Sequence, residues 1–511
     1  MKTFSNFAVS FTIISILSGC LTLFGFAMNV GGPAVMTLGW LFVGFFVTLV
    51  ALGMAEVASS YPTAGGLYYW AAKLAPESGR SAAKWSWFVG WFNLVGQVAV
   101  TAGIDFGLAL FTTAFLNLAF GVTVTPTVTI AVYGVMLVLH GLLNTFGIRL
   151  VTILNDVSVW WHIVGVTVIV IVCVLLNQHT TTSLNTVFSE TVNNTGFDPT
   201  SGPSLMFMGI PLYVALIGLL NAQYTLTGYD ASAHMSEETH GADKAAPRGI
   251  VWSVVISVIA GFILLVAMNV GITPQVIFPS AADPNVLVDG YTHALQTATG
   301  VPPVQIWIDA VGQSLGMFVL LVVIGAQFYC GMSSVTANSR MIYAFSRDGA
   351  VPGSAFWHRI NHRTRTPTNS IWLAAAGAFV LGLPYLYSPV AYFAITSIAV
   401  IGLYVAYIAP VFLRLMAGKG FKEGPWTLGR WSRPIGIVAT IWVVFIFILF
   451  MLPQAFPVTI QSFNYTPLVF LVVLGGAAIW YAVSAKNWFK GPKVQGTPEE
   501  LLAIEQELEV I

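Results

Sequence analysis

The stretch TLTGYDASAHMSEE, at residues 225–238, interrupts an apolar run with the sequence IPLYVALIGLLNAQY at residues 210–224. It contains a glycine, Gly228, and a carboxylate, Asp230. Backbone exposed to lipid must satisfy its hydrogen bonds internally, so a polar break at membrane depth is tolerated only inside protein or beside a water-filled cavity. An ionisable side chain at that depth indicates a functional site. We therefore expect this break to form half of a substrate site.

The composition of the chain indicates a membrane protein. Charged residues make up 8% of the sequence and hydrophobic residues 57%, whereas soluble domains contain about 25% charged residues. The net charge is zero, so we expect no basic surface for nucleic acid. The first apolar run is too long for a signal peptide and lacks its cleavage site. The cysteines lie in apolar runs and predict neither a disulfide framework nor a metal site; they are Cys20, Cys173 and Cys330.

Twelve segments are long and apolar enough to span a membrane, which takes about 20 residues. They predict an all-α integral membrane protein with twelve transmembrane helices. The segments lie at residues 9–37, 38–60, 85–116, 127–146, 151–177, 210–235, 249–272, 305–346, 368–387, 389–414, 434–454 and 465–486. The remaining residues, 487–511, are expected to form a cytoplasmic tail. Its sequence TPEELLAIEQELE suits either a short helix with a capping box or a frayed end.

The charges in the loops predict the orientation, because cytoplasmic loops have an excess of Lys and Arg. If the N-terminus is cytoplasmic, all 20 Lys and Arg residues fall on the cytoplasmic side of these spans. The outer loops then contain acidic residues, among them Glu190, Asp198, Asp283 and Asp289. We predict a multi-pass protein of the cell membrane with both termini in the cytoplasm.

A second break is expected in the first span, FTIISILSGCLTLFGFAMNVGGP at residues 11–33, where Ser18 and Gly19 fall near the middle. The first and sixth spans occupy corresponding positions if spans one to five and six to ten are two repeats. Interruptions at corresponding positions are the best sequence pointer to the binding site of a transporter. Free N–H groups at such breaks suit a carboxylate, and free carbonyl groups suit an ammonium group or a cation.

Several motifs, taken together in this order, resemble those of the amino acid–polyamine–organocation (APC) superfamily. They are SG in the first span, GGP…GW (31–40), EVASSYPTAGGLYYW (56–70), WWHIVG (160–165), TLTGYD…SEET (225–239), APRGI (246–250), SRMIYAFSRDGAVP (339–352) and TPTNSIW (366–372). The chain is most similar to the branch that transports γ-aminobutyrate, other amino acids and choline.

The resemblance implies a 5+5 inverted-repeat core of leucine-transporter type and two peripheral helices. The first repeat would lie at about 9–177, the second at about 210–414 and the peripheral helices at about 434–486, within a transmembrane domain at residues 1–486.

The same resemblance implies the substrate-binding residues. Backbone N–H groups of the first break would hold a substrate carboxylate, and carbonyl groups of the second would hold its amine. Relatives usually have Gly-Ser-Gly at the first break, whereas Leu17 replaces the first glycine here. Gly25 and Gly31, further along the first span, could instead serve only for close packing. The implied residues are Ser18, Gly19, Cys20, Tyr224, Thr225, Thr227, Gly228 and Tyr229.

Two ionisable residues are candidates for coupling or gating. Asp230 stands where many relatives have Glu, and a buried carboxyl group can bind and release a proton. It could instead be satisfied by neighbouring hydroxyl or N–H groups. His162 lies near a position where some relatives have a Lys in place of a sodium ion. Imidazole can also bind a proton, although a histidine in a span can simply form hydrogen bonds that aid packing.

Three further polar residues allow two interpretations each. Asp105 could attract a cationic group of the substrate or form a hydrogen bond across helices. Ser333 and Ser334 lie near the sodium site of relatives, but hydroxyl groups there are also ordinary packing residues. We expect no metal or organic cofactor. Proton coupling is the main expectation, and sodium coupling is the alternative.

We expect a secondary-active permease that imports an amino acid or a related amine by alternating access. Its partners would be the small-molecule substrate and the lipid bilayer, whereas the sequence does not predict an oligomeric state. Alternatives are a choline, polyamine or γ-aminobutyrate permease, a substrate-sensing receptor on the same fold, or a channel. The sequence has no catalytic triad, metal cluster or phosphate-binding loop, so neither an enzyme nor an ATP-driven pump is expected. No Lys or Arg lies near the breaks, which favours neutral or cationic substrates.

Overall fold

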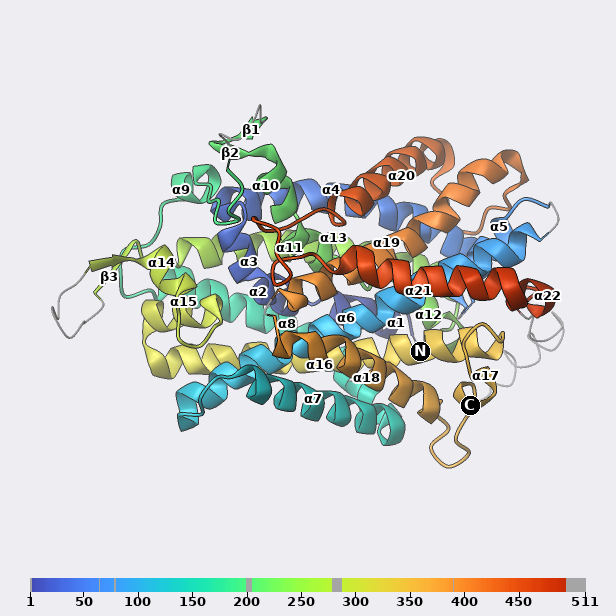
Figure 1. Ribbon diagram of the computed structural model, residues 1–511, viewed down its shortest axis with the longest axis horizontal. Coiled ribbons are helices and arrows are strands. Elements are labelled where there is room, and N and C mark those ends of the chain that lie inside the picture. Colours follow the sequence, from blue (N-terminus) through green and yellow to red (C-terminus); the bar gives the residue numbers. More distant parts are fainter. Residues whose placement is uncertain are drawn as a thin grey trace.

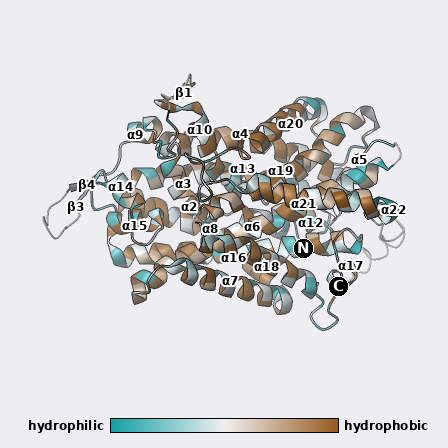
Figure 2. Cartoon of the chain, viewed as in Figure 1, coloured by the Kyte–Doolittle hydropathy of each residue, from teal (hydrophilic) through white to brown (hydrophobic). Residues whose placement is uncertain are grey.

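Figure 1 shows the computed structural model of the chain, which describes residues 2–63, 65–77, 80–198, 205–277, 287–388 and 390–492. The predicted tail helix at residues 497–509 lies outside these residues. The long helices run side by side along the longest axis of the molecule (Figure 1). They are hydrophobic along most of their length (Figure 2). This arrangement suits a bundle that crosses a bilayer.

Among the described residues, 11 helical segments are long and apolar enough to cross a membrane. They are formed by α1 (Thr3–Ile14) with α2 (Ile16–Thr22), α4 (Gly32–Ser60), α6 (Ser81–Phe120), α7 (Pro126–Phe146), α8 (Ile148–Val170) with η1 (Ile171–Leu175), α13 (Ala242–Val270), α16 (Gln313–Arg347), α18 (Thr368–Gly382) with η4 (Leu383–Leu386), α19 (Ala391–Ala417), η6 (Gly429–Trp431) with α20 (Ser432–Leu449), and α21 (Thr466–Trp480) with η7 (Tyr481–Ala485) and α22 (Lys486–Trp488). The sixth predicted span is interrupted and consists of α10 (Leu212–Gly218), α11 (Leu220–Thr225) and α12 (Ala231–His234). With this interrupted span, the structure agrees with the twelve predicted spans.

Short elements gather at the two ends of the bundle. Toward the left of Figure 1 lie α9, α14, α15 and β3, and toward the right lie α5, α17 and α22. Their bounds are α5 (Gly66–Leu74), α9 (Leu184–Ser189), α14 (Gly290–Leu295), α15 (Pro302–Val311), α17 (Ser354–Trp357) and α22 (Lys486–Trp488). Two antiparallel hairpins pair β1 (Met206–Phe207) with β2 (Ile210–Pro211) and β3 (Gln275–Ile277) with β4 (Leu287–Asp289). We call the left end of Figure 1 the loop end and the right end the basic end, since the basic end has Lys73 in α5, Lys486 in α22 and Arg347 as the last residue of α16.

Two predicted helix boundaries are wrong because glycines with positive φ end helices early. The first span ends with α3 (Phe24–Asn29), not at residue 37, since Gly31 and Gly32 have φ of 102° and 73°. Pro33 follows in the first turn of α4, where its missing N–H group has no cost. The predicted eighth span, 305–346, is two helices, because Gly312 with φ of 79° separates α15 from α16.

Helices from the two halves of the chain pack tightly on one another. The second and seventh spans approach at Gly261, where an added Cβ atom would lie 2.2 Å from the ring of Trp40. Trp40 Nε1 also donates a hydrogen bond to the Val258 carbonyl, at 2.8 Å. The third span meets the tenth at Gly96, where a Cβ atom would lie 2.6 Å from the backbone nitrogen of Leu403. Small residues permit such approaches between helices in membranes.

Candidate functional site

The first break lies at Ser15, between α1 and α2. Ser15 has the left-handed backbone conformation, with φ of 33° and ψ of 84°, and its carbonyl oxygen accepts hydrogen bonds from the amides of Ser18 and Gly19 at 2.8 and 2.9 Å. The predicted position, Ser18-Gly19, is therefore helical, and the break lies one turn earlier. Leu17 has a high helix propensity, which favours continued helix over this turn.

The second break lies at residues 226–230, between α11 and α12, where the prediction placed it at Thr227 and Gly228. Gly228 has φ of 90°, a conformation that glycine adopts without steric cost. Two tyrosines of α19 bind the broken backbone. Tyr404 donates its hydroxyl proton to the Leu226 carbonyl at 2.5 Å, and Tyr407 accepts a hydrogen bond from the Gly228 amide at 3.1 Å.

The two breaks are in direct contact. Ser10 donates its hydroxyl proton to the Tyr229 carbonyl at 2.8 Å. An added Cβ atom on Gly19 would lie 2.8 Å from Thr225 Cα, and one on Gly228 would lie 2.3 Å from Ile13 Cγ2. The substrate-site residues predicted from the resemblance thus lie on two segments that touch. All eight of them are buried, and this conformation therefore encloses both breaks.

Asp230 is the last residue of the second break and is fully buried. Tyr407 donates to Asp230 Oδ1 at 2.6 Å, while Gln97 Nε2 and His234 Nε2 lie 2.7 and 3.1 Å from Asp230 Oδ2. The carboxyl group thus has neighbours on the third, sixth and tenth spans. None of these three partners was predicted from the sequence. Of these, only His234 has a local signal, since it lies four residues after Asp230 and so on the same helix face.

His162 contacts the first break. Its Nδ1 atom lies 2.7 Å from the Ser158 carbonyl oxygen, which can only accept, so Nδ1 bears a proton. In the neutral imidazole, Nε2 is then an acceptor, and it lies 2.7 Å from Ser15 Oγ. Ser15 therefore donates to His162 from the residue at which the helix breaks. The left-handed backbone conformation costs about 1–2 kcal/mol of free energy. The hydrogen bond from Ser15 to His162 compensates part of this cost.

The sequence profile described as "Amino acid permease" matches residues 1–474. The chain belongs to this amino acid permease family. The amino-acid permease BAT1 of Arabidopsis thaliana is 40% identical over 500 residues, which cover 96% of this chain and 93% of that protein. Its homolog from Oryza sativa subsp. japonica is 40% identical over 507 residues, covering 96% and 92%. The GABA-specific permease of Saccharomyces cerevisiae is 29% identical over 509 residues, covering 96% and 82%.

These similarities confirm the predicted superfamily and the twelve-helix fold. The permease is a multi-pass membrane transporter for amino acids and not an enzyme. The remaining polar residues singled out from the sequence have partners across helices. Ser334 Oγ lies 2.9 Å from Thr101 Oγ1, and Ser333 bonds to Asn155. Asp105 pairs with His140.

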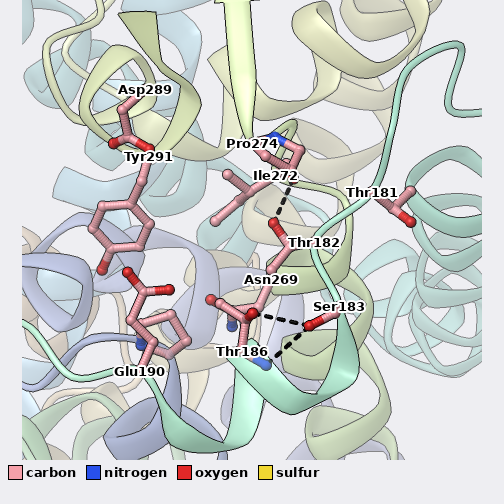
Figure 3. Close-up of a pocket in the computed structure, with 11 residues that line it drawn as sticks. Thr181, Thr182, Ser183, Thr186, Glu190, Asn269, Ile272, Pro274, Asp289 and Tyr291 are labelled. Carbon is pink, nitrogen blue, oxygen red and sulfur yellow. Dashed lines mark hydrogen bonds between the residues drawn. The ribbon is translucent and has the colours of Figure 1, made fainter.

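The permease also has a hollow of about 340 Å³ at the loop end (Figure 3). Two exposed carboxylates, Glu190 and Asp289, face it together with the ring of Tyr291, whose hydroxyl donates to the Met28 carbonyl at 2.6 Å. Thr182, Ser183 and Asn269 contribute polar groups on the other side. The hollow lies between the connections at the loop end and the ends of spans, and none of the predicted substrate-site residues lines it.

Proposed function

We propose that the permease imports amino acids or related amines by proton-coupled, secondary-active transport, and that the substrate binds between the two breaks. The observation that supports this proposal best is the direct contact of the breaks beside a buried carboxyl group, Asp230. Residues 9–177 and 210–414 would form the two inverted repeats, and 434–486 would form the peripheral helices. The tail at 487–511 and the N-terminus would lie in the cytoplasm of a cell whose plasma membrane contains the permease, because the basic end would face inward.

The broken helix ends supply groups of both polarities for an amino acid. The first four N–H groups of a helix have no acceptor within it. At the start of α2, the Ser15 carbonyl accepts from the amides of Ser18 and Gly19, and the amides of Ile16 and Leu17 are candidates for binding a carboxylate. At the second break, the carbonyl groups of Thr225 and Thr227 are candidates for the amine. Opening the contact between the breaks would expose both sets at once.

The proton would act through Tyr407. Its hydroxyl donates to Asp230 and accepts from the Gly228 amide, so it joins the carboxyl group to the backbone of the second break. A protonated Asp230 no longer needs all three neighbouring donors. Protonation would therefore loosen or rearrange the bond that holds Gly228. In alternating access, the first, second, sixth and seventh spans would then move against the third, fourth, eighth and ninth.

The test is transport by the purified permease in proteoliposomes. Radiolabelled neutral, cationic and acidic amino acids, γ-aminobutyrate, polyamines and choline would each be offered with an inward proton gradient, with an inward sodium gradient, and with neither. We expect accumulation of a neutral or cationic compound with the proton gradient. The proposal fails if no compound shows accumulation or counterflow, and binding without flux would favour the receptor alternative. Accumulation that follows sodium alone would assign the coupling to sodium.

Replacement of His162 by Asn should change the pH dependence of uptake. The variant lacks the imidazole nitrogen that accepts from Ser15, so the geometry of the first break would no longer respond to protonation of this residue. We expect the midpoint of the pH profile of initial uptake rates to shift by about one pH unit, equivalent to about 1.4 kcal/mol. His179→Asn, which changes an exposed histidine, is the control and should leave the profile unchanged. An unshifted profile in His162→Asn would remove this residue from the mechanism.

The hollow at the loop end should favour cationic substrates. The double variant Glu190→Gln, Asp289→Asn removes two negative charges, and Asn at position 289 can still cap α14 through Thr292. We expect the initial uptake rate of a cationic amino acid to fall by about threefold at low ionic strength, with little change for a neutral one. The difference should vanish at about 1 M salt, where the Debye length is about 3 Å. Equal losses for both substrates would contradict electrostatic attraction by the hollow.

A further inference from the structure

The permease contains a second buried carboxylate–imidazole pair, which the proposed function does not use. Asp105 of α6 and His140 of α7 are both fully buried, and His140 Nδ1 lies 2.6 Å from Asp105 Oδ1. The eighth span has Gly331 at this point. An added Cβ atom there would lie 2.5 Å from His140 Cε1 and 2.8 Å from Asp105 Oδ1. The ring of Phe328 covers the imidazole, with ring centroids 4.5 Å apart.

Two of the four polar side-chain atoms of this pair lack a hydrogen-bond partner among the described residues. They are Asp105 Oδ2 and His140 Nε2, and both are buried. Buried polar atoms usually have partners, and an exception requires an explanation. A pair that served only to join two helices would not need a histidine whose second nitrogen lacks a partner. Both free atoms are available for a proton or for a water molecule that delivers one.

The groups around the pair leave its charge uncompensated. The titratable side chains that interact with Asp105 from neighbouring helices are Tyr133, Tyr224 and Cys330. Two more tyrosines contact its neighbours on α6, Tyr385 at Phe106 and Tyr392 at the Gly103 carbonyl. Tyrosine and cysteine are neutral at physiological pH unless strongly perturbed. With an ionised Asp105 and a neutral imidazole, the pair has a net charge of −1. One proton on His140 Nε2 produces an imidazolium–carboxylate pair with a net charge of zero.

A polar stripe on α6 connects this pair with Asp230. Asn93, Gln97, Thr101 and Asp105 recur every four residues, which places them on one helix face, and all four are buried. Gln97 donates to Asp230 at 2.7 Å. Thr101, the next position, contacts Ser334 and accepts from Asn338 at 3.0 Å. Asp105 lies eight residues beyond Gln97, about 12 Å along the helix.

We infer that the Asp105–His140 pair is a second proton-binding site of the permease, distinct from Asp230. The proton enters at His140 Nε2 and leaves from the same atom, while Nδ1 stays bonded to Asp105. The pair thus alternates between net charges of −1 and zero. The pair lies between the third, fourth and eighth spans. Its protonation would therefore change the charge among the spans against which the first, second, sixth and seventh spans move. This inference rests on the proposed proton coupling.

The experiment measures the number of protons transported per substrate molecule in proteoliposomes, from the membrane potential at which net flux reverses at fixed gradients. In Asp105→Asn, the side chain keeps its shape, but no carboxylate stabilises the imidazolium. We expect this variant to transport one proton fewer per substrate molecule than the wild type and to retain counterflow. His140→Gln should give the same result by removing the proton acceptor itself. Thr336→Val, which removes a buried hydroxyl bonded to Asn144 nearby, is the structural control and should leave the ratio unchanged.

An unchanged proton ratio in a folded Asp105→Asn or His140→Gln variant would overturn the inference, even if the rate falls. Thermal unfolding in detergent identifies variants that fail to fold. The test needs only one of the two variants, Asp105→Asn or His140→Gln, to fold. A different result would contradict the proposed function itself, namely a reversal potential of the wild type that does not depend on the proton gradient. A ratio that falls in Thr336→Val as well would indicate a general effect of packing and would also overturn the inference.

Discussion

Asp230→Asn should lower proton-driven accumulation of substrate and leave substrate exchange. If one of the protons that accompany each substrate molecule binds Asp230, an inward gradient of about one pH unit gives this proton about a tenfold contribution to accumulation, since a factor of ten corresponds to about 1.4 kcal/mol. Asparagine cannot bind the proton, so the variant should lose this tenfold contribution and keep only the coupling of the Asp105–His140 pair. Counterflow of labelled substrate against an internal pool needs no net proton movement and should persist.

The surroundings of Asp230 should tolerate this substitution. The amide oxygen can still accept from Tyr407, and the Gln97 side chain can rotate its amide group to accept from the new NH₂ group. His234 can change tautomer in the same way. The matched control is Asp309→Asn at the loop end, which also removes a carboxylate bonded to a histidine, with His293 Nδ1 at 2.9 Å. Accumulation should be normal in the control, and normal accumulation in Asp230→Asn would exclude this residue from coupling.

Gly19→Ala should disable uptake and exchange together. The added Cβ atom would lie 2.8 Å from the Thr225 Cα atom and 2.5 Å from its Oγ1 atom, closer than real Cβ contacts allow. Because a backbone atom is involved, rotation of the threonine side chain cannot relieve the clash, and α2 must separate from α11. Overpacking of this kind costs about 1–3 kcal/mol. We expect transport rates to fall by at least tenfold, with a lower unfolding temperature.

The matched control for this substitution is Gly475→Ala in α21. That glycine is also helical, and an added Cβ atom there would meet nothing within 4 Å. Alanine has the higher helix propensity, by about 1 kcal/mol, so the control should be as active as the wild type and at least as stable. Uptake by Gly19→Ala within twofold of the wild type would show that close contact between the breaks is not needed for transport.

Much of the fold could be predicted because it depends on local composition. The apolar segments identify the spans, since only about 20 apolar residues in a helix can cross the bilayer. Gly228 within a polar interruption identifies the second break, and its φ of 90° agrees with that prediction. The spans predicted as 9–37 and 305–346 were wrong at their ends. There, glycine pairs or single glycines adopt positive φ, and composition alone does not reveal which glycines do so.

The first break could not be placed from the sequence, because its position depends on a contact between distant residues. Ser15 leaves the helix where His162, 147 residues away, accepts its hydroxyl proton at 2.7 Å. Nothing near Ser15 in the sequence indicates that partner. The pairing of Asp105 with His140 is similar, since either residue alone suits a role in helix packing. Only the approach of α6, α7 and the glycine of α16 brings their atoms together.

The sequence by itself determined that the chain spans a membrane, where its spans lie, and that the sixth span contains a polar break. These properties follow from hydropathy and from the conformational freedom of glycine, which act within one segment. The tertiary structure decided that the first span breaks at Ser15, that the breaks touch, and which partners surround Asp230 and Asp105. Those features depend on hydrogen bonds across helices. A buried polar atom must find its partner in space, and the chain does not place that partner nearby in sequence.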